Sequence, residues 1–104
     1  MLKPVMLEWR PRALLRFDLL LDEIGQHNPL AAEDFGRLVT KKIGLALKFP
    51  MLYRASSRVA GTREIVVTPN YLVPYRLTSE AVEVLDIVHA RRNWPDPSAS
   101  ALAS

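Results

Sequence analysis

Arginine, tyrosine and histidine side chains that could bind a phosphate or transfer a proton gather in the second half of this sequence. With one tryptophan, the set is Arg63, Tyr71, Tyr75, Arg76, His89, Arg91, Arg92 and Trp94. Arginine stabilises negative charge that develops on a phosphate, histidine or tyrosine can transfer a proton, and aromatic rings stack on bases. Such a set would suffice for metal-free cleavage of RNA, in which a 2′-hydroxyl attacks the neighbouring phosphate.

A structural interpretation of the same residues is also open. Tyr71 and Tyr75 fit a hydrophobic core, and Trp94 would pin the chain end against a sheet. The two histidines, His27 and His89, have no metal-ligand spacing to another histidine or a carboxylate, and the sequence has no cysteine and no glycine-rich phosphate loop. We therefore expect neither a metal site nor a cofactor.

Composition and charge indicate a small cytoplasmic domain with a basic middle segment. The chain has 104 residues, 49% of them hydrophobic, which is enough for one compact core. The absence of cysteine fits a reducing compartment, and no stretch has the length of a membrane span or the pattern of a secretory signal. The net charge is +3, and residues 54–76 carry four arginines against Glu64. Such a segment would attract a phosphate backbone or an acidic protein surface.

Hydrophobic spacing predicts a strand followed by two helices in the first half of the chain. Residues 2–9 are short and apolar-rich, and a helical period then runs from about residue 12 to residue 26. Asn28 can cap a second helix, Pro29 suits its first turn, and Pro50 ends it. The two helices should form a hairpin.

The second half predicts a loop and a meander of strands. A loop is expected over residues 51–61, and strands are expected at residues 62–67, 71–77 and 81–89. The short connections require antiparallel neighbours. Pro74 cannot donate to a strand ladder, so we expect a local irregularity beside Tyr75.

These elements predict an α+β fold of order β-α-α-β-β-β, in which a helical hairpin lies on one face of a small, mainly antiparallel sheet. The other face is expected to be free, with arginines gathering on it or along its rim. One domain should span residues 1–95, and residues 96–104 should form a flexible tail.

The residues that close the chain resemble a known family. The run GTREIVVTPNYLVPYRLTSEAVEVLDIVHARRNWP, the helix junction NPLAAEDF and the proline after the second helix are similar to those of the RelE/ParE superfamily of toxins. These toxins are the stable partners in type II toxin–antitoxin modules. The resemblance implies that the protein inhibits growth, that a cognate antitoxin neutralises it, and that it reaches operator DNA only through that antitoxin.

The resemblance leaves the molecular target open between two branches. RelE-like members are ribosome-dependent mRNA endoribonucleases, for which the implied catalytic candidates here are Arg63, His89 and Arg92. ParE-like members poison DNA gyrase. Ribonuclease members often carry an arginine shortly before the middle-strand tyrosine, where this chain has Leu72, and leucine cannot stabilise a developing charge. We therefore favour the ParE-like branch, with an inactive antitoxin-binding module as a third alternative.

Two surfaces are expected to bind partners. The residues expected to contact the target are Arg63, Tyr75, Arg76, Arg91, Arg92 and Trp94. An antitoxin that covers the helical hairpin would account for surplus apolar surface at Leu15 and Leu19. The alternative is that both leucines pack within the domain.

Overall fold

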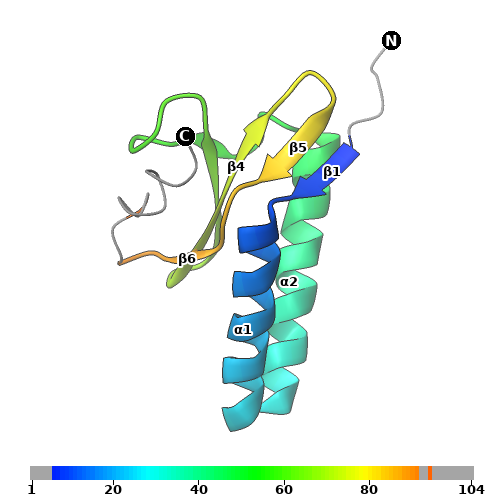
Figure 1. Cartoon of the computed structure of the whole chain (residues 1–104), viewed down its shortest axis with the longest axis vertical. Helices are drawn as coiled ribbons and strands as arrows, with labels where there is room; N and C mark the ends of the chain where they lie inside the picture. The colour runs from blue at the N-terminus through cyan, green and yellow to red at the C-terminus, as the bar shows by residue number, and fades with distance from the viewer. Residues whose placement is uncertain (1–5, 92–93, 95–104) are drawn as a thin grey trace.

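Two helices cover one face of a six-stranded sheet in the part of the chain that the computed structural model describes, residues 6–91 and 94 (Figure 1). The expected α+β class and the helical hairpin on a mainly antiparallel sheet are confirmed. The expected tail at residues 96–104 lies outside the described residues. The elements are β1 (Met6–Trp9), α1 (Pro11–His27), α2 (Pro29–Lys48), β2 (Arg54–Ala55), β3 (Arg63–Thr68), β4 (Tyr71–Leu77), β5 (Ala81–Val84) and β6 (Val88–His89).

The sheet has the strand order β1-β5-β4-β3-β2, and β6 pairs with β4 beyond the end of β5. Strands β3, β4 and β5 form the predicted antiparallel meander. The first strand, β1, pairs with β5 in parallel, with Met6 opposite Ala81. Two expectations were wrong in detail: the loop over residues 51–61 contains the short strand β2, and the strand expected over residues 81–89 is broken into β5 and β6.

The break between β5 and β6 faces Pro74. Tyr75 pairs with Val84 and Leu72 pairs with Val88, so three steps along β4 oppose four steps along its partner. This extra residue is a bulge. The Pro74 carbonyl accepts a hydrogen bond from the Leu85 N–H at 2.9 Å, which shows that the side of Pro74 without a donor faces the bulge. The irregularity expected near Pro74 is therefore present, and it lies on the neighbouring strand.

Asn28 forms the whole connection between the two helices. Its backbone N–H donates to the Ile24 carbonyl at 2.9 Å and so ends α1. Its side-chain oxygen accepts the Ala31 N–H at 3.1 Å and so caps α2, with Pro29 in the first turn as predicted. Because one residue performs both functions, the two helices are tightly antiparallel.

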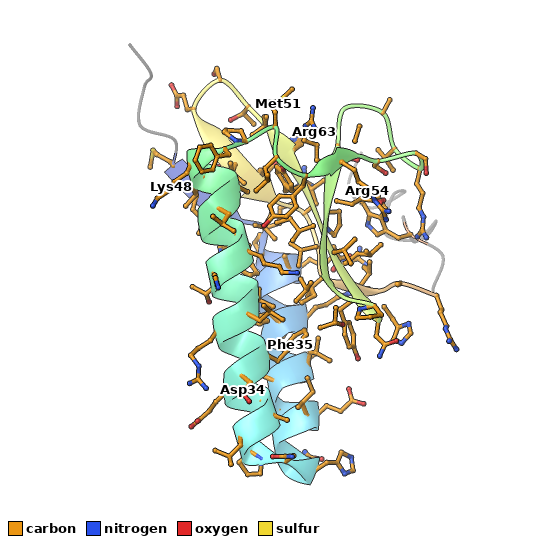
Figure 2. All side chains as sticks on the ribbon, turned by 180° about the vertical axis from the view of Figure 1, so that it is seen from behind. Asp34, Phe35, Lys48, Met51, Arg54 and Arg63 are labelled. Atoms are coloured by element: carbon orange, nitrogen blue, oxygen red, sulfur yellow. The ribbon has the colours of Figure 1, made fainter. Side chains whose placement is uncertain are left out.

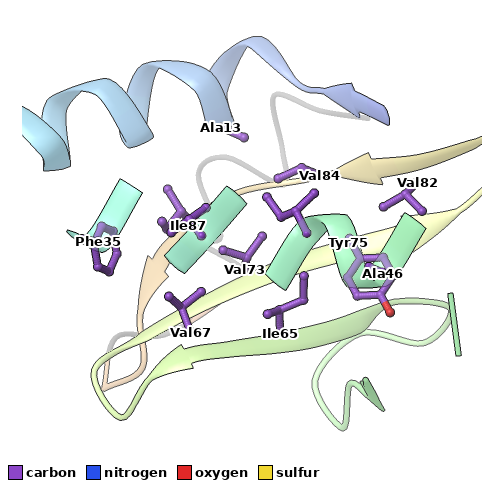
Figure 3. Packing of buried hydrophobic residues seen from close by; sticks show 12 residues of the cluster. Ala13, Phe35, Ala46, Ile65, Val67, Val73, Tyr75, Val82, Val84 and Ile87 are labelled. Atoms are coloured by element: carbon purple, nitrogen blue, oxygen red, sulfur yellow. The ribbon is translucent and has the colours of Figure 1, made fainter. Parts of the chain in front are cut away.

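The main hydrophobic core lies between the helical hairpin and the sheet (Figure 3). Its α2 stripe is Phe35, Val39, Ile43 and Ala46. Lys42 lies beside this stripe, and its Nζ donates to the Val66 carbonyl at 2.8 Å, which ties α2 to β3. The other core members are Ala13, Ile65, Val67, Val73, Tyr75, Val82, Val84 and Ile87.

The outer face of the sheet, expected to be free, is partly covered. Leu72, Val88 and Trp94 form a second buried cluster there, and Val59 and Leu85 pack against it. Leu72 points outward because it alternates with Tyr71 and Val73, whose side chains contact the hairpin side. The sheet is therefore covered on both faces around the middle of β4.

A pair of glycine substitutions tests the backbone. Gly61 has a φ of 82°, a backbone conformation that residues with a side chain rarely adopt. Gly44 lies inside α2. A Cβ added at either position would meet no atom within 4 Å, so steric contact does not distinguish them. We expect Gly61→Ala to lower the free energy of unfolding by about 1 kcal/mol. Gly44→Ala, its matched control, should raise it by about 0.5–1 kcal/mol. Urea unfolding measures both changes. Equal effects of the two substitutions would contradict the positive φ of Gly61.

Candidate functional site

The residues expected to act together in RNA cleavage lie apart. Arg63 pairs with Tyr75 at one end of β4, and His89 pairs with Tyr71 near the other end. Four residues along a strand correspond to about 13 Å between the backbones at the two positions. Arg92, the third candidate, lies outside the described residues. The backbones of Arg63 and His89 are therefore well separated on the sheet.

Arg63 belongs to a network that fastens the loop after α2 to the sheet. Its Nη1 donates to the Tyr53 carbonyl at 2.6 Å, and the Tyr75 hydroxyl donates to the Pro50 carbonyl at 2.8 Å. The Tyr53 hydroxyl in turn donates to the Lys42 carbonyl at 2.9 Å, and the Tyr53 and Tyr75 rings meet edge to face at 6.3 Å. This network holds the backbone of the loop at two points.

The Tyr53 and Tyr75 hydroxyls of this network should lose their protons at a higher pH than an exposed tyrosine does. Burial raises the pKa of Tyr75 above 10.0 although Arg63 opposes the shift, and burial also raises the pKa of Tyr53. Unfolded tyrosine loses its proton at about pH 10, before these hydroxyls do, so stability should fall as pH rises above that value.

Tyr75→Phe tests this pH dependence. The variant should lose about 1 kcal/mol at neutral pH, because the hydrogen bond to Pro50 is lost. When the pH is raised from about 9 to about 11, the free energy of unfolding should fall less in the variant than in the parent, because phenylalanine has no hydroxyl to ionise. Urea unfolding at the two pH values, with ultraviolet absorbance to follow ionisation, measures both effects; an identical alkaline loss in parent and variant would contradict the role of Tyr75.

Arg76, another expected target contact, lies on the outer face in an ion pair. Its Nε is 2.5 Å from Oε1 of Glu83, and Arg10 approaches the second oxygen of the same carboxylate at 3.5 Å. Part of the positive charge of Arg76 is therefore balanced on the surface of the protein.

The C-terminal rim combines one exposed arginine with a buried anchor. Arg91 is exposed, and its backbone N–H donates to Nδ1 of His89 at 3.2 Å. The His89 ring meets Tyr71 edge to face at 5.3 Å. Trp94 is only 9% exposed and Tyr75 is 0% exposed, so in this conformation neither presents its side chain to a target. Their contact with a target stays a prediction; in this conformation both side chains lie beneath the surface.

Two buried carboxylates bind arginines in a way that sequence reasoning missed. Asp86 lies within 3.5 Å of the Nε atoms of both Arg12 and Arg16, and so joins α1 to the bulge. Glu64 pairs with Arg54 at 3.1 Å and accepts the Ser56 hydroxyl at 2.9 Å. For Asp86, the available signal was an isolated acid between Leu85 and Ile87. The Glu64 pair engages Arg54, one of the four arginines of the basic middle segment.

Apolar surface on the helices is exposed as expected. Leu15 is 59% exposed and Leu19 57% exposed, so the alternative in which they pack within the domain is wrong. A shallow groove of about 700 Å³ runs between the two helices, and neither leucine lines it. Sequence analysis did not identify this groove. Its lining residues are Phe17, Leu21, Glu33, Gly36, Arg37, Thr40 and Lys41.

Among residues 6–91 and 94, no group of three histidine or acidic side chains could hold a metal ion. Neither α1 nor α2 is long and apolar enough to cross a membrane.

Sequence comparisons identify relatives over most of the chain. The family model described as "ParE toxin of type II toxin-antitoxin system, parDE" matches residues 7–94. Toxin RelE2 of Caulobacter vibrioides is 38% identical over 85 residues, which cover 81% of this chain and 93% of RelE2. Y4kP of Sinorhizobium fredii is 37% identical over 93 residues, which cover 86% of this chain and 92% of Y4kP.

Solved structures support the same fold. A chain from the chromosomal ParDE system of P. aeruginosa matches with a TM-score of 0.71 and 18% identity, over 83% of this chain and 96% of its own length. YafQ from E. coli matches with a TM-score of 0.54 and 20% identity, over 83% of this chain and 93% of YafQ. The chain therefore belongs to the ParE family of type II toxin–antitoxin toxins, within the RelE/ParE superfamily.

Proposed function

We propose that this toxin inhibits growth by poisoning DNA gyrase. The match to the ParE family over residues 7–94 is the observation that carries the proposal. Two features of the sheet support it. The ribonuclease candidates Arg63 and His89 pair with opposite ends of β4, and Leu72 is buried in the outer cluster where a ribonuclease would benefit from an arginine.

A ribosome-dependent mRNA endoribonuclease is the second candidate. The 38% identity to toxin RelE2 favours it, because that protein bears the name of the ribonuclease branch. In that case Arg63, His89 and Arg92 would need to act at separate points on the ribosome-bound message. A module that binds antitoxin without any toxic activity is the third.

The toxin's partner is a cognate antitoxin, and we propose that it binds the outer side of the hairpin. Leu15 and Leu19 offer exposed apolar surface on α1, and the groove beside α2 has Arg37 and Lys41 on its rim. Leu15 and Leu19 lie on the side of α1 opposite to Phe17 and Leu21 of the groove, so an amphipathic helix on α1 would bury the two leucines and leave the groove for another segment of the antitoxin. The toxin would act in the cytoplasm and reach operator DNA only as part of this complex.

A short induction experiment tests the choice of target. Growing bacteria are induced to make the toxin and are pulsed separately with labelled thymidine and labelled methionine. Gyrase poisoning predicts a prompt fall in DNA synthesis with DNA-damage signalling while translation continues. Immediate loss of translation with cut messenger would overturn the proposal and favour the ribonuclease. Purified toxin should also inhibit DNA supercoiling by gyrase.

A further inference from the structure

The loop between α2 and β2 displays three large apolar side chains to solvent. Phe49 is 59% exposed, Met51 66% and Leu52 55%. They follow one another within four residues at the end of α2, and Figure 2 shows Met51 at the same end of the molecule as Lys48 and Arg63. Contiguous exposed apolar side chains of this size are typical of a protein contact surface.

The loop holds these side chains in a fixed arrangement. The Phe49 N–H donates to the Leu45 carbonyl at 2.8 Å, and the Leu52 N–H donates to the Phe49 carbonyl at 2.9 Å. The Tyr75 hydroxyl donates to the Pro50 carbonyl, just before Met51, and Arg63 donates to the Tyr53 carbonyl, just after Leu52. Because the backbone is already ordered, a partner that binds here does not have to order it, which lowers the entropic cost of association.

The charge around the loop is positive. Residues 35–63 contain seven lysines or arginines and no aspartate or glutamate. Lys48 and Arg54 flank the loop, with Arg54 ion-paired to Glu64 at 3.1 Å, and the Arg63 guanidinium reaches the Tyr53 carbonyl. A guanidinium has five N–H donors, so Arg63 can hold a carboxylate as well as that carbonyl. The complementary surface is therefore apolar at its centre and acidic at its edge.

We propose that Phe49, Met51 and Leu52, together with Lys48 and Arg63, form the surface by which the toxin docks on its target protein, and we name these five residues the loop surface. The inference rests on the proposed function, because it takes the target to be a protein. The target side is an apolar cleft bordered by carboxylates.

Other occupants fit the loop surface less well. An RNA would offer no apolar cleft for Met51 and Leu52, and of the three apolar side chains only Phe49 has a ring that could stack on a base. A second copy of the chain in a symmetric contact would place Lys48 and Arg63 against the same cations. The antitoxin is proposed to bind other residues, the exposed Leu15 and Leu19 on α1 and the groove between the helices.

The double variant Met51→Ser, Leu52→Ser tests the inference, with Leu30→Ser as its control. Leu30 is 71% exposed in the first turn of α2 and belongs to neither proposed surface. The double variant should need at least about tenfold more toxin for half inhibition of gyrase supercoiling, as the loss of two anchor side chains at an interface predicts. Growth inhibition should weaken in parallel, and Leu30→Ser should match the parent in both assays.

Thermal unfolding of each variant separates docking from folding, because exposed apolar side chains replaced by serine change stability little. Lys48→Glu is a second variant that keeps the apolar side chains and should also weaken inhibition. If the parent inhibits gyrase and the folded double variant inhibits it equally, the loop surface is not the docking surface. If the parent spares gyrase but the double variant still loses growth inhibition, the proposed function fails while the loop surface stands. If the parent cuts messenger and the double variant cuts it equally, both fail.

Discussion

Replacing Trp94 with alanine is expected to lower the free energy of unfolding by about 3 kcal/mol, the usual cost of removing a large aromatic side chain from a core. Trp94 lies on the outer face of the sheet, where its ring packs with Leu72 and Val88 and is only 9% exposed. Its loss would open the second cluster on the outer face of β4. Urea unfolding measures the change.

Trp94→Phe is the matched variant for this test. It keeps an aromatic ring in the cluster, so it should lose about 1 kcal/mol and retain growth inhibition. A loss below about 1 kcal/mol for Trp94→Ala would mean that the outer cluster contributes little, and the anchoring role of Trp94 would have to be abandoned.

Asp86→Ala is expected to cost about 2 kcal/mol. The carboxylate is buried, lies within 3.5 Å of two arginines, and accepts the Ile87 backbone N–H at 2.8 Å. Removal of one member of a buried ion cluster commonly costs 3–5 kcal/mol. The lower value is expected here because the Arg12 and Arg16 side chains are 37% and 35% exposed, so water can screen part of their repulsion.

Asp86→Asn separates charge from hydrogen bonding in this cluster. Asparagine keeps an oxygen for the Ile87 N–H but no charge for the arginines, so we expect about half of the alanine effect. Added salt should reduce the difference between the variants and the parent, because it screens the repulsion between Arg12 and Arg16. Equal stability of Asp86→Ala and the parent would show that the bulge does not depend on this carboxylate.

Sequence reasoning predicted the parts of the fold that depend on neighbouring residues. Asn28 and Pro29 begin α2 through contacts within one turn, and the alternation from Tyr71 to Leu77 sorts β4 into its two faces. It did not predict that β1 would pair with β5, because that register depends on residues at opposite ends of the chain. The bulge opposite Pro74 was anticipated only as an irregularity, since the proline marks a missing donor without showing which strand will adapt.

In the candidate site, too, features set by residue type were predictable and features set by residues far apart in the sequence were not. Residue types identified Arg63 and His89 as chemically capable, but their separation is set by strand register, which no local pattern encodes. The partners of Arg12 and Arg16 were missed for the same reason, because Asp86 is far away in sequence. Residues 51–61 were expected to form a loop, yet nothing in the composition showed that Met51 and Leu52 would be exposed rather than folded inward.

The parallel pairing of β1 with β5 has a consequence for synthesis. Met6 to Trp9 leave the ribosome early, whereas Ala81 to Val84, their neighbours in the sheet, are made near the end. The helical hairpin can form from local contacts while translation continues, but closing the sheet over so long an intervening chain is slow and late. A product terminated before residue 81 keeps β1 without its neighbour and β4 without β5. Fragments that end before residue 81 are therefore expected to lack the closed sheet and, with it, toxicity.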